Sequence, residues 1–127
     1  MIHLRNLPLP CPLNRLYRAM PMTKGGRHFS VQVLSKQARQ KRDLVVAAIH
    51  EQLGGRPAPM CGMVQVSYTI TPRNKRTPDV DAYEKHLLDC LQKAGVFPND
   101  KQVVQISKER LEPKFPGHLD VQVWEVE

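Results

Sequence analysis

Apolar and polar side chains alternate most clearly along residues 63–70 of the chain. Because successive strand residues point to opposite faces of a sheet, this alternation predicts a strand with one buried face. The apolar positions of this strand are Val64, Val66, Tyr68 and Ile70. Shorter patterns of the same kind predict strands over residues 1–9, 103–109 and 118–126, the last with Leu119, Val121 and Val123 on its apolar face.

Helical periodicity predicts one helix over residues 35–53 and a second from about Asp81 to Gly95. Ser35 suits an N-cap, and glycines at the two C-terminal ends suit the left-handed conformation that stops a helix. The apolar stripes are Ala38, Val45, Ala48, Ile49 and Leu53 in the first helix, and Tyr83, Leu87, Leu88, Leu91 and Ala94 in the second. The order β-α-β-α-β-β predicts a single α+β domain over residues 1–127, with a small mixed sheet of about four strands and two helices packed on it.

Residues 14–28 are predicted to form a loop that contains the glycine pair Gly25-Gly26. Its cations are interleaved with aromatic residues, a pattern suited to following a phosphate backbone. An ordinary surface loop with incidental charge explains the same residues equally well. The cations are Arg15, Arg18, Lys24 and Arg27, and a second group, Arg73, Lys75 and Arg76, follows the strand at 63–70.

The chain carries 19 Lys and Arg against 12 Asp and Glu, a net charge of +7. This excess favours a polyanionic partner, and nucleic acid rather than a membrane because no basic amphipathic helix or lipidation signal is present. The alternative is a basic surface without a partner.

Three isolated cysteines without a CxxC pair indicate a reducing, cytoplasmic setting and no structural zinc site. No stretch has the pattern of a signal peptide or the length of a membrane span.

Against this basic background, carboxylates gather around the second predicted helix. If the chain before the helix is extended, Asp79 and Asp81, two residues apart, project to the same side. Such crowded carboxylates suit Mg²⁺, which takes oxygen ligands and can activate water at a phosphate. Helix capping and an ordinary ion pair between residues four apart, Lys85 and Asp89, are the alternative explanation. The polar stripe of the helix consists of Asp81, Lys85, Asp89 and Gln92.

The spacing D-x-D-x3-K-x3-D-x5-G-x4-D-x2-V, from Asp79 through Asp100 to Val103, resembles that of the RusA family of Holliday junction resolvases. The segment LPLPCPLNRLYR at residues 7–18 is similar to the N-terminal part of that family. The resemblance implies a bacterial or phage enzyme, a homodimer that binds four-way DNA junctions and nicks two strands symmetrically. It implies Mg²⁺, with Mn²⁺ as a substitute, held by Asp79, Asp81 and Asp100, and Lys85 as a supporting catalytic cation.

Two residues depart from the family pattern: Ala82 stands where Asn is frequent, and Asn99 where an Asp often precedes Asp100. Chain length also sets a condition on Asp100. A helix from Asp81 to residue 94 is about 20 Å long, and the next six residues span at most about 20 Å. Asp100 must therefore fold back tightly, the helix must end early, or a second subunit must supply Asp100.

Two other functions remain open from the sequence. One is a metal-dependent nuclease acting on flaps or single strands, and the other is a non-catalytic protein that binds branched DNA through the cations listed above. His86, about 140° around the helix from Asp81, is expected to be a solvated or edge histidine rather than a metal ligand.

Overall fold

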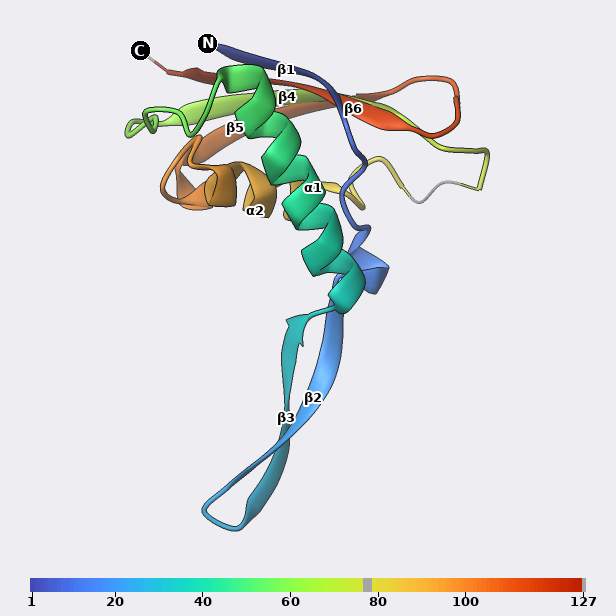
Figure 1. Ribbon diagram of the computed structural model, residues 1–127, viewed down its shortest axis with the longest axis vertical. Helices are drawn as coiled ribbons and strands as arrows, with labels where there is room; N and C mark the ends of the chain where they lie inside the picture. Colours follow the sequence, from blue (N-terminus) through green and yellow to red (C-terminus); the bar gives the residue numbers. More distant parts are fainter. Residues whose placement is uncertain (77–78, 127) are drawn as a thin grey trace.

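The structure is a computed structural model that describes residues 1–76 and 79–126. Its main sheet has four strands in the order β1-β6-β4-β5 (Figure 1). The strand β6 is antiparallel to both of its neighbours, whereas β5 runs parallel to β4 and is reached through α2. The bounds of the strands are Ile2–Leu7 for β1, Val64–Thr71 for β4, Val103–Arg110 for β5 and His118–Glu125 for β6.

Two helices, α1 (Lys36–Leu53) and α2 (Glu84–Ala94), pack on the apolar face of this sheet. Ser35 caps α1 by accepting a hydrogen bond from the Ala38 N–H at 3.0 Å, and Gly54 ends the helix at a φ of 74°. The opposite face of the sheet is polar, so the domain has two layers and one main core. The predicted α+β class, mixed sheet and two packed helices are confirmed. The two helices and the sheet all contribute fully buried residues to this core, among them Val45 and Ile49 of α1, Leu87 and Leu91 of α2, and Leu119, Val121 and Val123 of β6.

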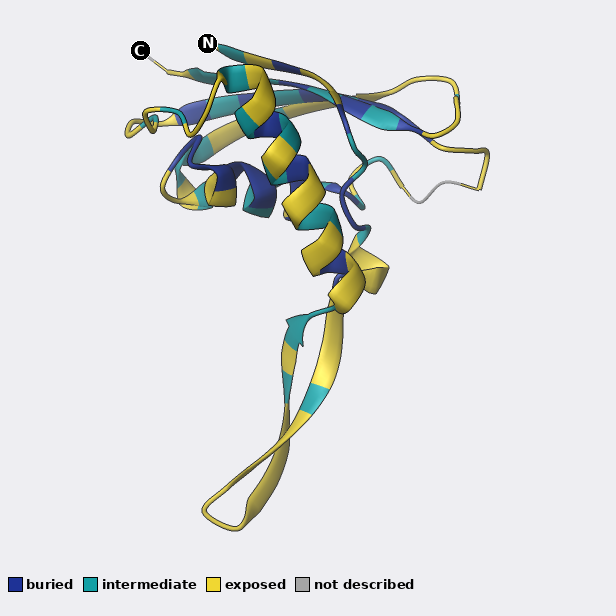
Figure 2. Cartoon of the chain, in the orientation of Figure 1, coloured by how far each residue is buried: buried dark blue, intermediate teal, exposed yellow. Residues whose placement is uncertain are grey.

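The predicted loop at residues 14–28 is wrong for most of its length. After a 3-10 turn, η1 (Leu13–Arg15), the chain forms a β-hairpin from β2 (Tyr17–Lys24) and β3 (Arg27–Leu34). Gly25 and Gly26, at φ values of 59° and 77°, make the two-residue turn with both φ angles positive that matches the twist of a hairpin. The hairpin projects from the body and is exposed along most of its length (Figure 2). The Gly-Gly pair between two alternating segments was the sequence signal that could have identified it.

The second helix begins at Glu84, about three residues later than predicted. Residues 80–83 form a turn instead, in which the Ala82 N–H donates to the Asp79 carbonyl at 2.9 Å. The Ala82 carbonyl accepts the Leu13 N–H at 2.8 Å. This contact from the N-terminal segment draws the carbonyl away from a helical partner. Thr77 and Pro78, the end of the predicted connection before this turn, lie outside the described residues.

Among residues 1–76 and 79–126, no helix combines the length and apolar character needed to cross a membrane.

Candidate active site

The polar stripe of α2 meets Asp100 in the same chain. Lys85 Nζ donates to Asp89 Oδ1 at 3.0 Å and lies 3.8 Å from Asp100 Oδ2. The Asp100 N–H donates to the Gln92 side-chain oxygen at 3.1 Å. Asp100 therefore folds back onto α2 within its own chain, whereas its pairing with Asp79 and Asp81 stays a prediction. Lys85, Asp89, Gln92 and Asp100 form one contact group, called here the α2 polar cluster.

A reversal after α2 makes this return possible. Gly95 adopts a φ of 90°, and the N–H groups of Gly95 and Val96 donate to the carbonyls of Gln92 and Leu91. This arrangement satisfies the last carbonyls of the helix and turns the chain back. A Cβ at position 95 would lie 2.8 Å from the Arg56 guanidinium carbon, so the glycine also leaves room for that side chain.

Asn99 then places Asp100 at the start of η2 (Asp100–Gln102). Its side chain accepts the Lys101 N–H at 2.9 Å, while the Gln102 side chain accepts the Asn99 N–H at 3.0 Å. This reciprocal capping box fixes the backbone on both sides of Asp100. Asn99, a departure from the family pattern, is therefore a structural cap in this chain.

Asp79 directly precedes the turn before α2 and Asp81 lies within it, and both are exposed. Because this segment is a turn and not extended, the alternation that would project the two side chains to the same side does not apply here. The turn is tied to the sheet by Tyr68 of β4, whose hydroxyl donates to the Val80 carbonyl at 3.2 Å and lies 3.4 Å from Glu84 Oε1. Glu84 also accepts a hydrogen bond from Lys108 of β5 at 2.9 Å. Burial raises the pKa of the Tyr68 hydroxyl well above its usual value, and Glu84 raises it further, so the group remains a donor. No local sequence pattern indicates this support, since it depends on side chains from three separate elements.

Within the described residues, no three or more His, Cys, Asp or Glu side chains are grouped closely enough to hold a metal ion. The metal role of Asp79, Asp81 and Asp100 stays a prediction.

The contacts of Lys85 determine its charge. Its hydrogen bond to Asp89 raises its pKa, although partial burial acts in the opposite direction, and Lys85 remains a cation beside Asp100 at neutral pH.

His86 is fully buried, so the expectation of a solvated or edge position is wrong. Its Nδ1 accepts the Cys11 N–H at 2.7 Å. Burial lowers the pKa of His86, which keeps the ring neutral and Nδ1 available as an acceptor. The N-terminal segment therefore packs over α2 and covers a helix position that periodicity alone assigns to an edge.

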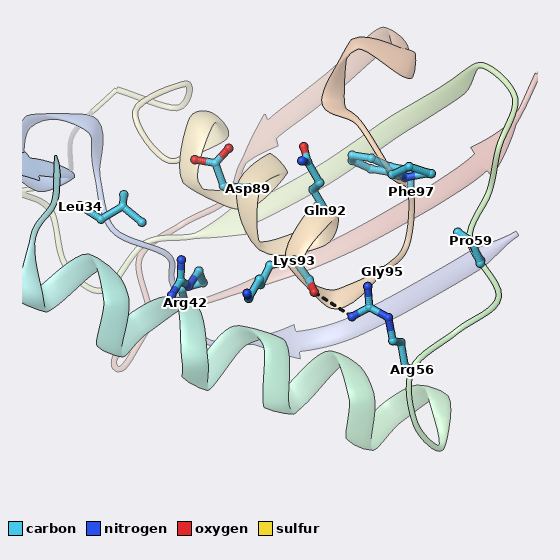
Figure 3. A pocket seen from close by; sticks show the side chains of 10 residues that line it. Leu34, Arg42, Arg56, Pro59, Asp89, Gln92, Lys93, Gly95 and Phe97 are labelled. Carbon is cyan, nitrogen blue, oxygen red and sulfur yellow. Dashed lines mark hydrogen bonds between the residues drawn. The ribbon is translucent and has the colours of Figure 1, made fainter. Parts of the chain in front are cut away.

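A cleft of about 630 Å³ adjoins the α2 polar cluster, between α1 and α2 (Figure 3). The Arg42 and Lys93 side chains enter it from the two helices. Arg56 lies along its far end and donates to the Lys93 carbonyl at 3.1 Å. Asp89 and Gln92 belong both to this cleft and to the cluster. The cleft therefore offers three cations in a depression that shares Asp89 and Gln92 with the α2 polar cluster.

The seven predicted DNA-binding cations are all exposed. Arg15 lies in η1, Arg18 and Lys24 in β2, and Arg27 in β3. The other three occupy the connection after β4, where the Arg73 guanidinium stacks 5.3 Å from the centre of the Phe115 ring. The structure thus separates these residues into a hairpin group and a group that leads towards Asp79. The second group consists of Arg73, Lys75 and Arg76.

The α2 polar cluster brings two carboxylates and a lysine together at the surface of a small, strongly basic α+β domain, the residue types that a nuclease uses at a phosphate backbone. A family model described as endodeoxyribonuclease RusA matches residues 17–123 of the 127. The chain belongs to the RusA family of endodeoxyribonucleases, as the motif spacing indicated, and the substrate of this family is the Holliday junction. A comparison with curated proteins finds no match.

Proposed function

We propose that this protein is a Mg²⁺-dependent Holliday junction resolvase that acts in DNA recombination and repair and cuts as a homodimer. The observation that carries the proposal is the return of Asp100 onto α2, 3.8 Å from Lys85. Two cuts at one junction need two active sites, and a symmetric dimer provides them. The family match supports the chemistry, and the basic surface supports the substrate.

The proposed metal ligands, Asp79, Asp81 and Asp100, fit a magnesium ion by their chemistry. All three are carboxylates, and Asp79 and Asp81 are exposed while Asp100 remains partly accessible. Hard divalent ions prefer such oxygen donors and commonly complete their shell with water and substrate phosphate. When bound, the ion would supply an activated water and stabilise the charge on the scissile phosphate.

The residues of the α2 polar cluster have separate tasks in this proposal. Lys85 presents a fixed positive charge for a phosphate oxygen as negative charge develops there. Asp89 holds the Lys85 ammonium group in place, and Gln92 holds the backbone of Asp100 through its N–H. The hairpin and the connection after β4 would bind the DNA backbone through the seven exposed cations named above.

The test is cleavage of a synthetic mobile four-way junction, with linear duplex and single-stranded DNA as comparison substrates. We expect paired symmetric nicks that require Mg²⁺ or Mn²⁺ and stop when EDTA removes the metal. The Asp79→Asn variant should bind the junction but lose cleavage. Asp43→Asn, which changes an exposed carboxylate on α1, is the matched control and should cut normally.

Other outcomes separate the alternatives. Tight junction binding without cleavage in either metal would identify a non-catalytic binding protein. Cleavage of flaps or single strands in preference to junctions would show a nuclease with a different substrate. Equal cleavage by the wild type and Asp79→Asn would remove Asp79 from the metal site.

A further inference from the structure

The β2–β3 hairpin has two chemically different faces. The strands pair in register from Tyr17 with Leu34 to Lys24 with Arg27, and side chains therefore alternate between the faces. One face begins at the base with Tyr17 opposite Leu34 and is then small and polar, with Ala19 opposite Gln32, Pro21 opposite Ser30 and Thr23 opposite His28. The other face, called here the apolar face, carries Met20 opposite Val31 and Met22 opposite Phe29, with Arg18 nearer the base and the pair Lys24 and Arg27 at the turn.

Among the residues that the structure describes, none from the body of the protein buries the outer part of the apolar face. Met22 and Phe29 are 40% and 43% exposed, next to the turn. The base of the hairpin packs on the body through the other face, where Leu34 contacts the small cluster of Cys11, Leu16 and Ala38. An isolated two-stranded hairpin is marginally stable in water, so exposed Met and Phe at its tip are unfavourable unless they meet a partner.

Charge identifies the kind of partner. Every side chain in residues 1–42 that is charged at neutral pH is cationic, and the first carboxylate of the chain is Asp43. Lys24 and Arg27 pair across the strands directly beyond Met22 and Phe29. Two such tips meeting across a symmetric dimer would bring like charges together. The combination of an apolar pair and flanking cations instead matches nucleic acid, in which an apolar side chain can enter a base step while cations bind the adjacent phosphates.

We propose that Met22 and Phe29 insert as a wedge between bases at the branch point of a DNA junction, with Lys24 and Arg27 on the neighbouring phosphates. The inference rests on the proposed function, since it supplies the way in which that function selects branched DNA. Separating stacked bases costs a few kcal/mol per step in duplex DNA. The cost is lower where stacking is already interrupted, so a wedge favours a branch point over a linear duplex.

The experiment uses a four-way junction with 2-aminopurine at the branch point, whose fluorescence rises when the base loses its stacking neighbours. We expect the full-length wild type to raise this fluorescence in EDTA, where no cleavage occurs. Phe29→Ala should remove most of the rise at saturating protein and weaken junction binding about tenfold, the scale of one lost aromatic–base contact. Phe29→Met, which keeps an apolar side chain, should retain most of both effects.

Two controls separate the wedge from charge and from hairpin folding. Ser30→Ala changes the next residue of the same strand on the polar face and should behave as the wild type. Arg27→Ala should weaken binding but keep the full fluorescence rise at saturation, because it removes only a phosphate contact. Thermal unfolding of each variant reports whether the body remains intact.

The inference is overturned if Phe29→Ala and Ser30→Ala give the same fluorescence and affinity. It is also overturned if sedimentation without DNA shows that Phe29→Ala dissociates a wild-type dimer, because a second copy would then cover the face. Its failure is distinct from failure of the resolvase proposal. Junction-specific cleavage without a branch-point signal would reject the wedge alone, and a branch-point signal without cleavage in Mg²⁺ or Mn²⁺ would support the wedge while rejecting catalysis.

Discussion

Within α2, adjacent residues have opposite environments: Lys85 is exposed, and His86 is fully buried against the N-terminal segment. The His86 ring accepts the Cys11 N–H, and the backbone of Leu13 bonds to Ala82 a few residues further along. These contacts hold the start of the motif between the N-terminal segment and the sheet. A histidine outside the proposed metal site therefore contributes to the position of the residues that form it.

His86 is expected to make stability depend on pH. Because its pKa is lowered in the folded state, the unfolded chain binds a proton first as the pH falls through the ordinary value of 6.5. The free energy of unfolding should therefore decrease from pH 8 to pH 5.5. His86→Asn keeps an acceptor near the Cys11 N–H and should flatten this dependence in urea unfolding. His3→Asn, at an exposed histidine of β1, should leave the dependence unchanged, and an equal effect of both substitutions would contradict the assignment.

Lys85 should affect catalysis far more than binding. Lys85→Met removes the charge beside Asp100 and is expected to slow junction cleavage about 10²- to 10³-fold, the usual effect of losing one transition-state contact. Junction affinity should change only a few-fold. Lys93→Met, on the same helix but in the cleft, is the control for lost surface charge. Comparable loss of cleavage in both variants would show that general electrostatic attraction, rather than the placement of Lys85, is responsible.

At the scale of elements, the reversal between α2 and η2 places Asp100 on the helix. Gly95 serves this reversal in two ways, through its φ of 90° and through the space it leaves for Arg56. Gly54 has a similar φ of 74° at the end of α1, but open space around the position of a Cβ. The two glycines therefore allow backbone strain to be measured separately from side-chain packing.

Gly54→Ala is expected to cost about 1 kcal/mol of stability through backbone strain alone. Gly95→Ala should cost roughly 1 kcal/mol more, because Arg56 must move away and lose its hydrogen bond to the Lys93 carbonyl. Chemical denaturation measures both values. Adding Arg56→Ala to each variant should abolish the difference between them, and a difference that persists would place its cause elsewhere.

The capping box before Asp100 allows a prediction of how Asn99, the residue that departs from the family pattern, affects stability and the Mg²⁺ requirement. Asn99→Asp keeps an acceptor for the Lys101 N–H and should leave stability within about 0.5 kcal/mol, whereas Asn99→Ala removes the cap at a cost of about 1 kcal/mol. The added carboxylate of Asn99→Asp should also lower the Mg²⁺ concentration needed for half-maximal cleavage. A rise in that concentration would indicate that Asn99 is better suited than Asp to this site.

At the scale of the whole molecule, the seven predicted DNA-binding cations lie in η1, on the hairpin and in the connection after β4. If all seven contact phosphates, the slope of log Kobs against log salt concentration should be about −6 for each subunit. Removing one contact, as in Arg27→Ala or Lys75→Ala, should reduce the magnitude of the slope by about 0.9. Filter binding over a series of NaCl concentrations measures this, and an unchanged slope in a variant would exclude that residue from the phosphate contacts.

The chain sequence by itself determined the elements whose burial is periodic. The strand at β4, both helix ends at Gly54 and Gly95, the α+β class and the family motif all follow from local patterns, because one-sided burial imposes a period of 2 or 3.6 residues on the sequence. The hairpin was not recognised because its strands are mostly exposed, and the body of the protein covers only its base.

The tertiary structure alone decided how the motif residues meet. Asp100 lies beside Lys85 because Gly95 and the Asn99 cap reverse the chain. His86 is buried under the N-terminal segment, where the N–H of Cys11, 75 residues away in the sequence, donates a hydrogen bond to its ring. No periodic pattern in the sequence indicates either contact, since each joins two segments that are distant in the sequence. Helical periodicity specifies which side of α2 a residue occupies, whereas the packing of the remaining chain determines which parts of that side are covered and which remain available to DNA.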